Sequence, residues 1–162
     1  MADYDLKSNA ISSVHIARAS ITATPTKASV DLLDYGSCTF QMYAGVGGIT
    51  FSGTNRVDFI VEESDNDSTW NVAPDDALIL DVGATAHGGT GIARSLIAAK
   101  ASADTMIPTV GYRGKKRYAR CTPTFAGTHG SGTIVGVDVV RGHPYHKPIG
   151  QSGVAEGGPV VQ

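Results

Sequence analysis

The sequence predicts an all-β protein, a single β-sandwich domain of the jelly-roll type. Glycine supplies 20 of the 162 residues, close to twice its usual share of about 7%, and this excess disfavours a helical bundle or coiled coil. Charged residues make up 17% of the chain, below the usual share of about 25%. Short runs of β-forming residues recur between turn residues, at the spacing expected of a sandwich or barrel. The length, with a hydrophobic content of 41%, suits one domain with one core.

The predicted domain occupies residues 18–141, between an N-terminal arm (1–17) and a Gly- and Pro-rich C-terminal tail (142–162). The arm has isolated apolar residues that fit neither the helix period nor the strand period. The tail contains three prolines and five glycines, a composition typical of an extended segment that becomes ordered on a partner. Short strands are expected at 28–33, 38–43, 49–51, 56–62, 69–72, 75–82, 95–98, 109–112, 115–122 and 133–141.

The clearest strand signals lie at 56–62 and 133–141. Alternate apolar residues share one face in both, namely Val57, Phe59 and Val61 in the first and Val135, Val137 and Val139 in the second. This period of two is typical of a half-buried strand. The polar string 64–68 then reverses the chain, so that 69–72 pairs with the first strand as a hairpin. Trp70, the only tryptophan, is expected to anchor the core or its edge.

Other segments carry weaker signals. The glycines in 45–48 predict a turn or a bulge, and 75–82 is expected to be a strand buried on both faces at its centre. Residues 109–112 and 115–122 are expected to form a hairpin that turns at Arg113 and Gly114. Pro108 is expected at a strand end, because proline cannot donate to a sheet ladder.

The segment 90–104 fits two structures. Its apolar residues at i, i+4, i+7 and i+11 would form the stripe of a helix, and they are Ile92, Leu96, Ala99 and Ala103. Such a helix would be alanine-rich and weakly apolar, whereas 95–98 fits an ordinary short strand. We therefore expect a strand followed by a loop.

The cysteines and the N-terminus indicate a protein that is not exported. Acids stand near the N-terminus where a signal peptide would carry bases. Cys38 and Cys121 are therefore expected to be reduced core residues, because disulfides form in oxidising compartments. The longest run of large aliphatic residues, 78–80, is far short of the ~20 apolar residues that cross a bilayer. No membrane association is expected.

Candidates for catalysis and metal binding are few. A metal-dependent enzyme would use His143 and His146, the one close pair of histidines. No third ligand lies beside them in the sequence, and Pro144 makes the segment extended. The glycine runs match neither a phosphate-binding loop nor a nucleophile elbow. We expect no cofactor and no enzymatic activity.

Charge is separated along the chain although the total is −2. Seven acids and no base lie between Asp58 and Asp76, whereas one short stretch holds five bases and no acid: Arg113, Lys115, Lys116, Arg117 and Arg120. One interpretation is a solvated turn and sheet face. The other is complementary docking, with the basic hairpin against the acidic edge of a neighbouring copy or of another protein. Nucleic acid is not expected as a partner, because the total charge is negative and few aromatic residues lie nearby.

Three stretches resemble a family of small virion structural proteins of tailed bacteriophages and related gene-transfer particles. They are 59–70 (FIVEESDNDSTW), 110–120 (VGYRGKKRYAR) and 142–148 (GHPYHKP). The resemblance spans roughly residues 29–148. It departs from the family at Ala119, where a β-branched residue is usual, and across 83–104. It implies a capsid-associated protein and supplies no catalytic residue.

We therefore expect a non-enzymatic capsid decoration or cement protein that binds the exterior of the virion shell and stabilises it. The implied partners are the major capsid protein and further copies of this chain, with a trimer as the first expectation. A head-spike, fibre-base or tail component with a receptor-binding role is the alternative. The candidate protein–protein contact residues are Arg113, Lys115, Lys116, Arg117, Arg120, His143, Tyr145 and His146.

Overall fold

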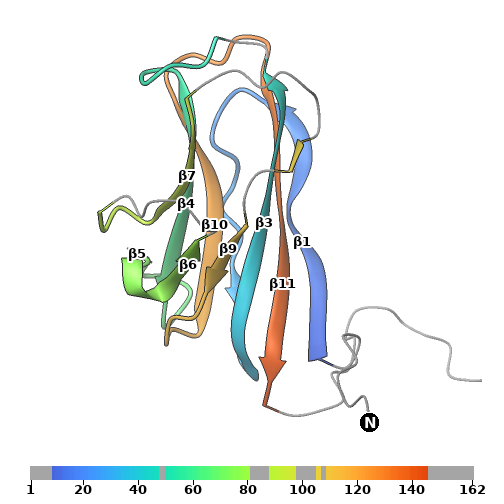
Figure 1. Ribbon diagram of the computed structural model, residues 1–162, viewed down its shortest axis with the longest axis vertical. Coiled ribbons are helices and arrows are strands. Elements are labelled where there is room, and N and C mark those ends of the chain that lie inside the picture. The colour runs from blue at the N-terminus through green and yellow to red at the C-terminus, as the bar shows by residue number, and fades with distance from the viewer. Residues whose placement is uncertain (1–8, 48–49, 81–87, 98–104, 107–108, 146–162) are drawn as a thin grey trace, which may run out of the picture.

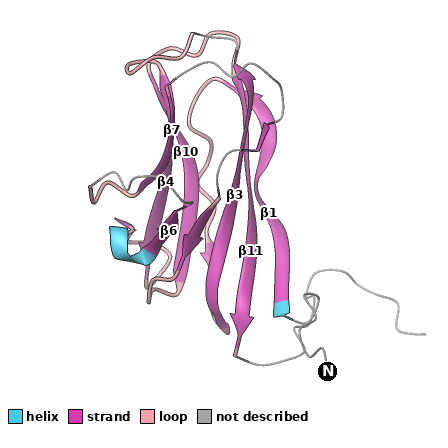
Figure 2. Cartoon of the chain, viewed as in Figure 1, coloured by secondary structure: helices cyan, strands magenta, loops and turns pink. Residues whose placement is uncertain are grey.

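The protein is an all-β sandwich of two antiparallel sheets (Figures 1 and 2). The computed structural model describes residues 9–47, 50–80, 88–97, 105–106 and 109–145. Its first sheet has the strand order β1-β11-β3-β9-β6, and β8 also pairs with β3. These strands are β1 (Ala10–Ile21), β3 (Tyr35–Gly47), β6 (Leu78–Leu80), β8 (Thr105–Met106), β9 (Val110–Tyr112) and β11 (Thr133–Pro144).

The second sheet has the order β2-β10-β4-β5, and β7 also pairs with β4. Its strands are β2 (Val30–Asp31), β4 (Arg56–Ser64), β5 (Asn71–Val72), β7 (Ile92–Leu96) and β10 (Tyr118–Ala126). A short 3₁₀ helix, η1 (Asp75–Ala77), leads from β5 in this sheet to β6 in the other. The strands predicted at 56–62 and 133–141 are confirmed as parts of β4 and β11.

The core lies between the two sheets. The alternating residues of β4 and β11 are all 1% exposed or less, as the sequence predicts: Val57, Phe59, Val61, Val135, Val137 and Val139. Each such side chain stabilises the fold by about 1.5–3 kcal/mol relative to an exposed position. Cys38 and Cys121 are buried among them, and burial raises the pKa of the Cys38 thiol to about 12.

β10 pairs with β2 over a short stretch only. The rest of this edge of β10 is covered by side chains from β1, in the other sheet, and from the segment that follows β1. The Cys121 N–H donates to His15 Nε2 at 3.3 Å, and the Phe125 N–H donates to Thr24 Oγ1 at 3.0 Å. Pro123, between them on the same edge, has no N–H to satisfy. An unpaired sheet edge is thereby removed. Burial lowers the pKa of His15 to about 4, which keeps the imidazole neutral and able to accept this bond.

Two domain boundaries differ from the sequence prediction. Residues 10–17, expected in an arm, belong to β1, which pairs along its length with β11. The register shifts twice, between Val14 and Ile16 and between Ile16 and Ala19. These irregularities hide the period of two in the sequence, because each bulge moves the following side chains to the other face. At the other boundary, β11 continues to Pro144, and residues 146–162 of the predicted tail lie outside the described part of the chain.

The expected hairpin of 109–112 and 115–122 is also wrong. β9 pairs with β3 and β6 in the first sheet, whereas β10 pairs with β2 and β4 in the second. The bend at 113–117 therefore crosses from one sheet to the other. Tyr112, 1% exposed, reaches back across the core, and its hydroxyl donates to Glu63 Oε2 at 2.7 Å.

The remaining strand predictions have mixed outcomes. β5 pairs with β4 as the expected hairpin partner. A register shift opposite 44–47 confirms the predicted bulge there. Ile79 is 52% exposed, so the strand expected to be buried on both faces is buried on one. β7 confirms a strand within 90–104, whereas Pro108 and residues 98–104 lie outside the described residues.

Candidate functional site

One end of the sandwich gathers the ends of three strands and a shallow hollow. Ala10 pairs with Gly142, and Tyr35 pairs with Pro144. The start of β1, the start of β3 and the end of β11 therefore lie together, at the lower end of the view in Figure 1. The hollow has a volume of about 240 Å³ and is lined by residues 32–36, 114–117 and Tyr145. We call this the hollow end.

Backbone hydrogen bonds fix the walls of the hollow. The Leu32 N–H donates to the Arg117 carbonyl at 2.8 Å, which joins two of the lining segments. The Tyr145 N–H donates to the Asp34 carbonyl at 2.9 Å, which joins the third. Asp34 adopts a positive φ of 70°, an uncommon conformation for a residue other than glycine. The hollow is therefore a defined feature of the fold.

The rim of the hollow carries apolar side chains as well as basic ones. Leu33 is 55% exposed and Tyr145 is 71% exposed. The sequence predicts Tyr145 as a contact residue but not Leu33, because Leu33 is expected at the end of a strand. The available signal was a large aliphatic residue directly before the turn residues 34–36.

Three of the five predicted bases form ion pairs within the chain. Lys116 Nζ lies 2.5 Å from Asp65, Arg117 Nη2 lies 2.7 Å from Asp31, and Arg120 Nε lies 2.8 Å from Glu62. The hydrogen bond from Arg117 holds the pKa of Asp31 below its usual value. Burial opposes ionisation of Glu62, but hydrogen bonds from Arg120 and Lys27 outweigh it and lower the pKa of that carboxyl. Two of these pairs, those of Lys116 and Arg120, join the basic segment to the acidic one within one molecule.

The other two bases behave differently. Arg113 Nε donates to the carbonyl of Asp76 at 3.2 Å, away from the hollow. Lys115 lines the hollow and is exposed, and no acid of the described chain pairs with its ammonium. Arg113 and Lys115 are thus the two predicted bases that pair with no acid of the described chain, and of the two only Lys115 lines the hollow.

Of the two histidines predicted as a pair, His143 and His146, the structure describes only His143. His143 Nδ1 and Ser37 Oγ are 2.8 Å apart and share a hydrogen bond. His146 lies outside the described residues. In the part of the chain that the structure describes, no three His, Cys, Asp or Glu side chains lie close enough to hold a metal ion.

Arginine guanidinium groups cover several aromatic faces on the surface. Four pairs have Cζ within 5 Å of the ring centroid: Arg18 with Tyr43, Arg117 with Tyr118, Arg120 with Trp70, and Arg141 with Tyr35. Each such contact stabilises by roughly 0.5–1 kcal/mol at exposed sites. Trp70, expected as an anchor, is half-buried beneath Arg120. These rings are not free to form an open stacking platform.

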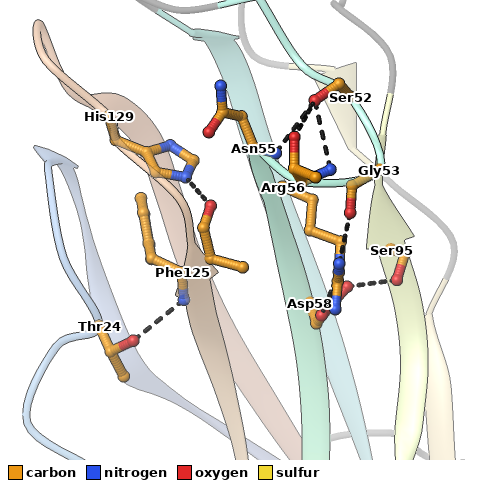
Figure 3. Close-up of polar contacts among 11 residues, drawn as sticks. Thr24, Ser52, Gly53, Asn55, Arg56, Asp58, Ser95, Phe125 and His129 are labelled. Atoms are coloured by element: carbon orange, nitrogen blue, oxygen red, sulfur yellow. Dashed lines mark hydrogen bonds and ion pairs between the residues drawn. The ribbon is translucent and has the colours of Figure 1, made fainter.

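At the opposite end of the sandwich, shown in Figure 3, several polar side chains form hydrogen bonds within the fold. Asp58, 5% exposed, accepts hydrogen bonds from Arg56 Nε and Ser95 Oγ. Ser52 Oγ accepts bonds from the backbone N–H groups of residues 54 and 55. His129, also buried, donates from Nε2 to the Ala126 carbonyl at 2.9 Å. We call this the closed end.

Comparison with known proteins gives no evidence for function, so the evidence comes from the fold and from the hollow end. No protein-family model matches the chain, and neither a curated protein nor a solved structure matches it significantly. The described residues contain no helix long and apolar enough to span a membrane. The structure thus defines the class of fold, an all-β sandwich, with a hollow at one end.

Proposed function

We propose that this protein is a non-enzymatic structural component of a tailed-phage virion, a decoration or cement protein that binds the outside of the capsid. The observation that carries the proposal is the hollow end. It combines a defined hollow, the exposed side chains of Leu33 and Tyr145, and Lys115, which has no acidic partner in the described part of the chain. Two of the stretches that carry the sequence resemblance include residues that line the hollow, namely 114–117 and Tyr145.

The chemistry of that end suits attachment more than catalysis. An apolar rim supplies the contact area and a free base supplies electrostatic complementarity, which together favour a protein partner. Contacts of this size are weak singly. On a capsid they are repeated at fixed spacing, so that the lattice supplies a high effective concentration for each additional contact.

A homo-oligomer, with a trimer as the first expectation, would bring several hollow ends to one symmetry axis of the shell. The major capsid protein is the proposed partner and the virion exterior the proposed location. The internal ion pairs of Lys116, Arg117 and Arg120 leave these bases little role in pairing with a neighbour's acidic segment, so we assign the contact to Lys115, Leu33 and Tyr145.

A spike, fibre-base or tail component that binds a receptor is the alternative. Such a component would need several open aromatic faces for stacking. The four arginine-covered rings do not provide them, and Tyr145 is the one strongly exposed aromatic side chain among the described residues. A metal-dependent enzyme that uses His143 and His146 would need further ligands, and no three His, Cys, Asp or Glu side chains lie together among the residues that the structure describes. Metal analysis of the purified protein tests that last idea directly.

The experiment that tests the proposal is a count of copies per virion by quantitative mass spectrometry. A decoration protein is expected at a fixed, high ratio to the major capsid protein. A few copies per particle would contradict the proposal and favour the tail or spike alternative.

A further inference from the structure

A second, smaller hollow lies between β1 and β2, the strands that stand at one edge of each sheet. It is lined by residues 13–15, 28–31, Val139 and Arg141 and has a volume of about 170 Å³. We call it the seam hollow, because it lies where the two sheets meet. Typical ligand pockets measure roughly 300–1,000 Å³, so the seam hollow suits one small group.

The side chains that face inward around the seam hollow are polar, in contrast to the rest of the core. Ser13 pairs with Val139, which is 1% exposed and faces the core, and directly opposite side chains share a face of the sheet. Arg141 lies two residues after Val139 in β11 and so shares that face too. His15 also faces inward, since its ring contacts that of Phe40, with 5.4 Å between the centroids. Polar side chains in such positions need polar partners.

Arg141 is the side chain whose needs the described chain leaves unmet. Its Nη1 donates to the Asp31 carbonyl at 3.2 Å, whereas its buried Nε–H has no acceptor. The Asp31 carboxylate is already paired with Arg117, whose Nε and Nη2 donate to its two oxygens at 3.0 and 2.7 Å. Two bases thus share one acid beside the seam hollow. Because Arg141 is half-buried, a counter-ion in the hollow would stabilise its charge.

The other polar groups of the lining can donate hydrogen bonds. His15 Nε2 accepts the Cys121 N–H at 3.3 Å, so the proton of the neutral ring is on Nδ1, which is then a donor. Ser13 and Ser29 are exposed residues of the lining, and their hydroxyls can donate as well. A lining with guanidinium, imidazole and hydroxyl donors complements the oxygen atoms of an anion.

We propose that the seam hollow binds one small oxyanion, a phosphate or a carboxylate group, through Arg141, His15, Ser13 and Ser29. The bound anion supplies the counter-charge for Arg141 that Asp31 already gives to Arg117. The seam hollow shares no lining residue with the hollow at the end of the sandwich. The inference therefore leaves the proposed contact surface uncovered and does not depend on the capsid assignment.

The test is an NMR titration of the isotope-labelled full-length chain with inorganic phosphate at neutral pH, with sodium chloride used to hold the ionic strength constant. Saturable shifts are expected at the Arg141 Nε–H and at the backbone N–H groups of residues 13–15 and 29–31, and not at Lys115. A parallel titration with acetate distinguishes the two sources of the anion. Saturation with both anions indicates a site that accepts carboxylates, and saturation with phosphate alone indicates a phosphate site. Shifts that grow linearly with both anions would overturn the proposal.

Two adjacent serines of β1 give a matched pair of variants. Ser13→Asp places a carboxylate in the seam hollow and is expected to weaken phosphate binding by a factor of about ten or more, the value of a hydrogen bond to a charged group. Ser12→Asp adds the same charge on the other face of β1 and should change binding less than about twofold, because solvent screens an exposed charge. Both serines are exposed, so both variants are expected to fold. Equal weakening in the two variants would show a response to net charge alone and would overturn the proposal.

Discussion

The two ends of this sandwich are built from the same strands but satisfy their polar and apolar groups differently. At the closed end, Asp58 and His129 are buried and hydrogen-bonded within the fold. At the hollow end, Leu33 and Tyr145 are exposed, and Lys115 pairs with no acid among the residues that the structure describes. Buried, satisfied polar groups hold a structure together, whereas exposed apolar groups beside a free charge are typical of a contact surface. From this difference we expect substitutions at the closed end to change mainly stability and substitutions at the hollow end to change mainly association.

Acid is expected to give the largest effect, because it acts on the sandwich body that both ends share. The pKa of His15 is about 4 in the folded protein against 6.5 for the free group. The unfolded chain therefore binds more protons between these values, and the free energy of unfolding falls as the pH drops from 6.5 to 4. The fall amounts to up to about 3 kcal/mol, and urea unfolding at a series of pH values measures it. In His15→Gln this part of the pH dependence should vanish; an unchanged slope would contradict the role given to His15.

Gly127→Ala at the closed end is expected to cost about 2 kcal/mol of stability. Gly127 has a φ of +79°, and an added Cβ would overlap Asn55 and approach the Thr54 carbonyl at 2.8 Å, so both backbone strain and crowding oppose the substitution. Urea unfolding gives the value. Gly130→Ala, three residues further, meets nothing within 4 Å and should stay within about 0.5 kcal/mol of the parent. Similar losses in the two variants would argue against the described geometry of this loop.

Tyr112→Phe, beneath the bend that lines the hollow, is expected to cost about 1–2 kcal/mol. The substitution leaves the half-buried Glu63 carboxylate without the hydroxyl at 2.7 Å. Thermal unfolding measures the loss, and Tyr118→Phe on the outer face serves as the matched control. If both phenylalanine variants are equally stable, the bond between the sheets does not contribute as assigned.

The smallest effect on stability is expected at the hollow rim itself. Leu33→Asp and Lys115→Glu should each change the free energy of unfolding by less than about 0.5 kcal/mol, since both side chains are exposed. The same variants should weaken binding to particles that lack the protein at least tenfold, as a sedimentation assay measures. Gly130→Asp at the closed end is the control and should bind normally. If the variants at both ends weaken binding to the particles equally, the hollow end is not the contact surface.

The sequence predicted the sandwich and most of its strands because β4 and β11 alternate without interruption. It missed β1 as part of the sheet, because two bulges break the alternation around Ile16. The sequence also predicted a hairpin of β9 and β10, which is wrong. The turn residues around Gly114 look the same in a hairpin as in a connection that crosses to the other sheet. Which sheet a strand enters depends on packing across the core, such as the reach of Tyr112 to Glu63.

The candidate site was predicted in part. The basic stretch and Tyr145 were named from sequence, and four of the residues, Lys115, Lys116, Arg117 and Tyr145, line the hollow together. Their division into paired and unpaired bases was not predictable, because the partners Asp31 and Asp65 are far away in the chain and meet the bases only in the folded sandwich. His143 and Arg120 lie outside that lining, and Leu33 carried too weak a sequence signal to be selected.

An electron-microscopy reconstruction of the virion tests the central claim most directly. The account predicts density for the sandwich at repeated positions on the outer capsid shell, with the hollow end toward the shell and the closed end toward solvent. Density found only at the tail would contradict the proposed function. Density on the shell with the closed end inward would contradict the assignment of association to the hollow end.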